Sequence, residues 1–136
     1  MIKKNFNDLK IGDTSLFAKT VTDADVFAFA GICGDFNPLH VNEEYAKKSM
    51  FGARIAHGML SASLIDYTLT NLVGLGGVHL SQFVKFMAPV KIGDTIQVES
   101  VITDLDSAKK RLKIKSTLTN QEGTIVLTGD AEGMLP

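Results

Sequence analysis

An aspartate and a histidine lie five positions apart in a short segment rich in turn-forming residues, Gly34 to His40 (GDFNPLH). Asn37 precedes Pro38, so a helical conformation is disfavoured at Asn37 and the φ angle of Pro38 is restricted. We therefore expect a rigid connection that holds Asp35 and His40 near each other. A carboxylate and an imidazole so placed can share one water molecule and act as a general acid–base pair. Spacing alone favours a simpler alternative, in which Asp35 caps the turn and His40 fills a polar pocket.

Helices are expected on both sides of this segment. Thr22 is a good N-cap for a short helix that ends near Gly31 or Gly34. Asn42 could cap a second short helix, Glu43 to Lys48. A third and longer helix is expected from His57-Gly58 to Gly74. Because apolar residues lie nearly all round this third helix, it should be buried on most sides.

Strands are expected at the start of the chain and throughout its second half. The apolar period changes to two after the third helix, and turn residues separate the segments. The letters KIGDT occur at residues 10–14 and 91–95, and we expect the same turn to precede a strand at both places. Helices followed by a run of strands indicate an α+β fold with an antiparallel sheet. The five strands expected are 15–21, 78–86, 95–105, 111–119 and 124–134.

Composition is that of an ordinary globular domain. The 136 residues are 45% hydrophobic and 21% charged, with a formal net charge of −1, so a single domain over residues 1–136 is expected. Lys and Arg are scattered, which argues against nucleic acid as a partner. No secretory leader or membrane span is apparent, and a cytoplasmic location is the default. The single Cys33 leaves no pair for a disulfide or a zinc site, and we expect it to be a small buried hydrophobe.

Three motifs carry a resemblance to a known family. The segment at 34–40, separated by five residues from Ala46, is followed by AHGML at 56–60 and by FMAPV at 86–90, with Gly-Asp at 93–94. In composition and spacing these motifs resemble the (R)-specific enoyl-CoA hydratases, the MaoC-like dehydratase family. The likeness spans nearly the whole chain, and its first motif is the most specific.

The resemblance implies a hot-dog fold, in which a five-stranded antiparallel sheet wraps one long central helix. It implies a homodimer whose sheets join edge to edge, and such dimers could pair further. The implied reaction is the reversible hydration of trans-2-enoyl-CoA to (3R)-3-hydroxyacyl-CoA. The acyl-CoA thioester is the substrate, and no cofactor or metal is implied. By the matched positions, Asp35 and His40 would be the catalytic pair, and the N–H of Gly58 would hold the thioester oxygen.

The residues suit that chemistry independently. Hydration of a conjugated thioester puts negative charge on the carbonyl oxygen, and a hydrogen-bond donor there lowers the barrier. Gly58 at a helix start has an unsatisfied N–H and no side chain. We favour Asp35 as the residue that activates the water, with His40 assisting and handling the Cα proton, although the sequence does not fix this division. Asn37 is expected to orient the turn, and it could also hydrogen-bond a catalytic side chain or contribute to substrate binding. Ile65 and Leu69, on the helix face of Gly58, could line an acyl tunnel or simply fill the core.

Other polar residues have two readings each. His57 either packs or caps at the helix start or contacts substrate, and we favour the former because it should point away from the Gly58 donor. His79 is expected to be structural. A carboxylate at Asp66 departs from the small polar residue expected in the hydratases; it could face a partner subunit or the catalytic pair. Three cations could contact the CoA phosphates or be ordinary surface charges: Arg54, Lys85 and Lys91.

Three alternative functions are considered. A dehydratase acting on acyl carrier protein would use the same residues but need a basic rim for its acidic partner. A hot-dog thioesterase generally carries its carboxylate on the long helix, which would assign Asp66. A non-catalytic acyl-CoA-binding subunit would need neither Asp35 nor His40.

Overall fold

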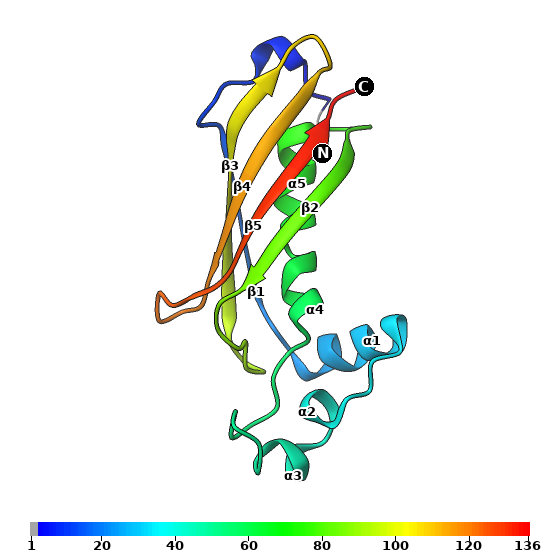
Figure 1. Ribbon diagram of the computed structural model, residues 1–136, viewed down its shortest axis with the longest axis vertical. Helices are drawn as coiled ribbons and strands as arrows, with labels where there is room; N and C mark the ends of the chain where they lie inside the picture. Colours follow the sequence, from blue (N-terminus) through cyan, green and yellow to red (C-terminus); the bar gives the residue numbers. More distant parts are fainter. Residues whose placement is uncertain (1–2) are drawn as a thin grey trace.

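The computed structural model describes residues 3–136, which form one antiparallel sheet curved around a long helix (Figure 1). The strand order is β1-β3-β4-β5-β2, so β1 and β2 form the two edges. The α+β class, the five-stranded antiparallel sheet and the central helix are as predicted. The strands are β1 (Thr14–Thr20), β2 (Val78–Phe86), β3 (Thr95–Asp106), β4 (Arg111–Thr119) and β5 (Ile125–Met134).

The strand predictions are confirmed because apolar and polar residues alternate along strands such as β4, and the apolar ones lie on the buried face. On β4, Leu112, Ile114 and Leu118 are at most 1% exposed, whereas Lys113 and Lys115 are exposed. The repeated KIGDT segments do form one turn used twice. In each, the aspartate side chain accepts from the backbone N–H of the lysine, at 2.9 Å for Asp13 and 2.8 Å for Asp94. The glycine between them has φ +96° or +97°, a conformation that favours glycine.

Three helices form a separate layer beyond one end of the sheet (Figure 1). The first, α1 (Asp23–Cys33), begins at a complete capping box: the Thr22 hydroxyl accepts from the N–H of Asp25, and the Asp25 carboxylate accepts from Thr22. It ends at Gly34, whose φ is +78°. Cys33 is exposed, so its prediction as a buried hydrophobe was wrong. Cys33 lies in the last turn of α1, and no other segment within residues 3–136 covers it.

Replacing Thr22 with Ala should cost about 1 kcal/mol of stability at neutral pH, because it removes the α1 cap. The Thr22 hydroxyl also holds the pKa of Asp25 below its usual value. A lowered carboxyl pKa stabilises the fold above the unfolded-state pKa, and that contribution is lost as pH falls through the folded-state pKa. The deficit of the Thr22→Ala variant should therefore shrink in acid. Urea unfolding of both proteins at pH 7 and near pH 3 would measure this; an equal deficit at both pH values would contradict it.

The remaining short helices are α2 (Pro38–Val41) and α3 (Glu43–Ala46). The first was expected to be only a turn. It is helical because Pro38 occupies its first position and the Asn37 side chain caps it, accepting from Leu39 N–H at 3.0 Å. Asn42 caps α3 as predicted, accepting from Tyr45 N–H, although the helix ends two residues earlier than expected.

The long helix is present as predicted, in two parts: α4 (Gly58–Ser63) and α5 (Ile65–Val73). At the junction, Leu64 donates to the carbonyl of Ser61 instead of that of Leu60. Most positions of the helix are buried, as expected, on the side that packs against the sheet and next to it. The opposite flank is exposed at Met59, Ser63, Asp66 and Tyr67. Within residues 3–136, no helix is long and apolar enough to cross a bilayer.

Candidate active site

Asp35 and His40 face each other across the segment between α1 and α2. The Asp35 Oδ2 atom lies 3.8 Å from His40 Nε2. The aspartate side chain is about half exposed and the histidine side chain is 12% exposed. This separation is too long for a direct hydrogen bond but allows one water to lie within about 2.8 Å of both atoms.

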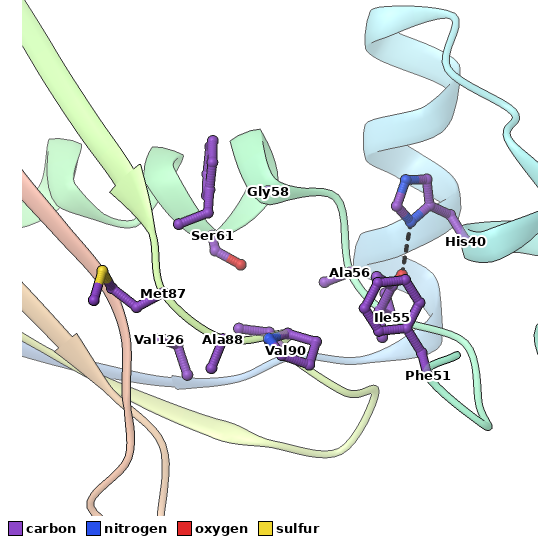
Figure 2. Close-up of a pocket in the computed structure, with 12 residues that line it drawn as sticks. His40, Phe51, Ile55, Ala56, Gly58, Ser61, Met87, Ala88, Val90 and Val126 are labelled. Carbon is purple, nitrogen blue, oxygen red and sulfur yellow. Dashed lines mark hydrogen bonds between the residues drawn. The ribbon is translucent and has the colours of Figure 1, made fainter. Parts of the chain in front are cut away.

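The orientation of His40 is set by a segment distant in sequence. Its Nδ1 lies 2.8 Å from the carbonyl oxygen of Ile55, which can only accept, so Nδ1 carries the hydrogen (Figure 2). Ile55 is itself tied to α2 by its N–H bond to Leu39, and Ala56 is tied to Val90. In the neutral ring, Nε2 therefore offers a lone pair toward Asp35.

The Asp35 carboxylate is oriented locally. Its Oδ1 atom accepts from the backbone N–H of Asn37 at 3.1 Å, which leaves Oδ2 directed at His40. Asn37 thus orients the segment twice, through this N–H and through its cap of α2. The expectation for its side chain was a role in the turn, and that is where the side chain lies.

A cavity of about 320 Å³ opens beside His40 and the first residue of α4 (Figure 2). Gly58 lines it, and the Gly58 N–H has no acceptor among residues 3–136. A Cβ atom at Gly58 would lie 2.8 Å from the Phe86 ring, so only glycine fits without displacement. The Gly58 N–H and the His40 side chain therefore adjoin the same space, and Asp35, which does not line the cavity, lies 3.8 Å behind His40 Nε2.

Most of the other residues around this cavity were not singled out from the sequence. Ser61 is 3% exposed, and its hydroxyl points into the cavity (Figure 2). It lies three positions after Gly58, a helical spacing that could have identified it. The apolar wall of the cavity comes from segments that are distant in the sequence: Phe51, Phe86, Met87, Val90 and Val126. Apart from the FMAPV motif, no sequence pattern indicated these residues.

Ile65 and Leu69 lie deeper along the helix, buried at 1% and 2% exposure, and do not line this cavity. Their tunnel role stays a prediction. Asp66 points to the opposite flank, where its Oδ1 lies 3.1 Å from Nδ1 of His79 on β2. Asp66 therefore contacts neither Asp35 nor His40.

Of the three cations considered as contacts for the CoA phosphates, Arg54 already forms ion pairs with two carboxylates. It donates to Asp23 at 2.6 Å and to Glu43 at 3.2 Å, which joins the starts of α1 and α3. Burial acts to lower the pKa of Arg54, but the two carboxylates outweigh it and hold that pKa above its usual value. Lys85 and Lys91 are exposed.

His57 packs at the start of α4, which is the interpretation favoured from the sequence. It is 3% exposed at the start of α4 but makes no cap hydrogen bond. Its Nε2 instead lies 2.9 Å from the backbone carbonyl of Asp35, and its ring stacks on His40. Donor atoms of Asp35, His40 and His57 lie within 4.8 Å of one another, a grouping compact enough to hold a metal ion. One of the His57 nitrogens is engaged with the Asp35 carbonyl.

Comparison with known proteins identifies the family. The model of the MaoC-like domain matches residues 8–124. The chain belongs to the MaoC-like domain family. It is 43% identical to an (R)-specific enoyl-CoA hydratase of Rhodospirillum rubrum, over the whole chain and 94% of that protein. A 3-hydroxybutyryl-CoA dehydratase of Methylorubrum extorquens is 39% identical over 96% of the chain and 83% of its own length.

The fold of this MaoC-like chain is also that of a solved relative. An (R)-hydratase from A. caviae superposes with a TM-score of 0.92 at 35% identity, covering 95% of the chain and 98% of the hydratase. The predicted family and hot-dog fold are thereby confirmed.

Proposed function

We propose that this protein adds water reversibly to trans-2-enoyl-CoA, giving (3R)-3-hydroxyacyl-CoA. The observation that carries the proposal is the Asp35–His40 pair, 3.8 Å apart, beside a cavity that begins at Gly58. The R configuration of the product is inferred from the (R)-specific hydratases to which the chain is similar. Residues 1–136 would work as one domain, and we expect a cytoplasmic location.

The water would be held by both of its hydrogens. Oδ2 of Asp35 and Nε2 of His40 are both acceptors, so a water donating to both keeps an oxygen lone pair for attack. That oxygen forms a bond to C3 as the π electrons of the C2–C3 double bond move toward the thioester, whose oxygen gains negative charge. The Gly58 N–H stabilises this enolate. Asp35 acts as the base for one water proton, and that proton passes on through Nε2 of His40 to C2, so both side chains return to their starting states.

The test is hydration of crotonyl-CoA. The enoyl absorbance should fall without release of thiol, and chiral analysis of the product should give the 3R isomer. Release of free CoA would instead indicate a thioesterase, and no change in either signal would indicate a binding subunit. Faster turnover of enoyl-acyl carrier protein than of enoyl-CoA would indicate the carrier-protein dehydratase. The thioesterase alternative is weakened because Asp66 contacts His79, outside the cavity lining.

We also propose that the protein is a homodimer. The edge strand β2 is exposed at Val78, Leu80, Phe83 and Phe86, and the adjacent flank of the long helix exposes Met59. A long apolar edge strand is a template for pairing with another strand, and a second copy of β2 would cover it.

A Phe83→Glu variant should be monomeric at concentrations where the wild type is dimeric. Phe83 is 65% exposed near the middle of β2, and antiparallel pairing would bring two introduced carboxylates close together. Sedimentation velocity measures the mass of each. The matched control is Leu16→Glu, an exposed apolar position on the opposite edge strand β1, which should stay dimeric. A dimer that survives Phe83→Glu and dissociates with Leu16→Glu would move the interface to β1.

A further inference from the structure

One buried polar side chain has no part in the chemistry proposed above. His57 is 3% exposed, and its Nε2 lies 2.9 Å from the carbonyl oxygen of Asp35. Since that oxygen only accepts, Nε2 carries the hydrogen and donates. The bond spans 22 positions and fixes the backbone of the residue that bears the carboxylate.

The His57 ring also restricts the other member of the pair. It stacks on His40 with centroids 3.8 Å apart and planes inclined by 30°. Phe29 of α1 packs at 5.2 Å from the same ring. His40 is thus held in plane by His57 and in rotation by its bond to Ile55. One ring contacts α1, the Asp35 backbone and α2, and it directly precedes Gly58.

Ordinary packing does not account for a histidine here. Nδ1 of His57 is buried and accepts no hydrogen bond from any residue within 3–136. A buried acceptor without a donor is unfavourable, and phenylalanine would fill the same space without that cost. Capping does not account for it either, because His57 makes no side-chain cap bond to α4. What histidine supplies and phenylalanine lacks is the donor to Asp35.

We propose that His57 is a positioning residue of the hydration reaction: it holds the Asp35 carbonyl and the His40 ring so that Oδ2 and Nε2 converge on one water. The inference rests on the proposed function. His57 acts through Asp35 and His40, and no contact with the substrate is required of it.

Two variants separate its contacts. His57→Phe keeps an aromatic ring for the stack and loses the donor, whereas His57→Gln keeps an amide donor and loses the ring. Misplacement of a catalytic group by about 1 Å can cost about 100-fold in rate. We expect kcat to fall about 10- to 100-fold in His57→Phe, with KM within about 3-fold, and we expect the Gln variant to recover part of the loss.

A double-mutant cycle distinguishes positioning from general damage. If His57 acts through Asp35, adding His57→Phe to Asp35→Asn should lower kcat by less than about 3-fold further. The matched control is Thr68→Val, which breaks a fully buried hydrogen-bonded chain, Thr68 to Ser100 to Ser116, far along the helix. It should lower the melting temperature, leave kcat within about 2-fold and combine multiplicatively with Asp35→Asn.

A readout independent of activity completes the test. The backbone ¹³C′ resonance of Asp35 should shift in His57→Phe and stay unchanged in Thr68→Val, because only the former removes a hydrogen bond to that carbonyl. An unchanged resonance, a kcat within 2-fold of wild type, or a fully multiplicative double mutant would each overturn the inference while the proposed function stands. If wild-type protein fails to hydrate enoyl-CoA although the resonance shifts, the proposed function falls, and the catalytic role of His57 falls with it.

Discussion

Asp35→Asn and His40→Gln should each lower kcat for hydration by about 10²- to 10⁴-fold, the usual scale for acid–base groups. Asparagine at position 35 retains an oxygen for the Asn37 N–H but cannot take a proton at neutral pH. Glutamine at position 40 removes the Nε2 lone pair that faces Asp35. Because Asp35 is about half exposed and the Asp35–His40 pair lies outside the core of the sheet, both variants should fold. Crotonyl-CoA hydration and circular dichroism measure the two effects.

The chain contains its own control for this experiment. Asp66 and His79 form a second aspartate–histidine contact, 3.1 Å long, outside the cavity lining. Asp66→Asn and His79→Gln are the same chemical changes and should leave kcat within about 3-fold. Near-wild-type turnover of Asp35→Asn or His40→Gln would remove that residue from the mechanism. A large loss in Asp66→Asn, together with thiol release by the wild type, would favour the thioesterase.

Gly58→Ala should lower kcat by about 100- to 1,000-fold, the scale of removing one oxyanion donor, about 3–4 kcal/mol. The added methyl would lie 2.8 Å from the Phe86 ring, so either the ring or the helix start must move. Both movements change the space next to the N–H where the thioester oxygen would be held. Single-turnover rates with crotonyl-CoA separate this loss from weaker binding.

A second glycine in a helix provides the comparison. Gly31 of α1 has open space where a Cβ would be built and no positive φ. Gly31→Ala should therefore keep full activity and gain stability by up to about 1 kcal/mol. Adding Phe86→Leu to Gly58→Ala should recover activity only if crowding causes the loss. Wild-type turnover in Gly58→Ala alone would contradict this prediction, since alanine keeps the backbone N–H and the Phe86 ring would then have moved without disturbing it.

Local hydrogen bonding explains what was predictable. Thr22, Asn42 and the aspartates of the two KIGDT turns bond backbone groups three residues away, so their neighbours suffice to predict the elements they begin. The strands follow for a similar reason, because alternation along β4 depends only on successive positions. The proximity of Asp35 and His40 could be predicted for the same reason, because both lie in one short segment whose backbone is restricted.

Most of the elements, the family and the two residues proposed as the catalytic pair could therefore be predicted from the order of residues. The groups that hold this pair in place, and the cavity beside it, are visible only in the folded structure. His57 meets Asp35 and Arg54 meets Asp23 across 22 and 31 positions, and the cavity wall joins Phe51 to Val126. The exposed flank of the long helix depends equally on which sides the sheet covers. Such contacts arise when packing brings distant segments together. They cannot be predicted from hydrophobic periodicity or turn-forming residues, because both depend only on neighbouring positions.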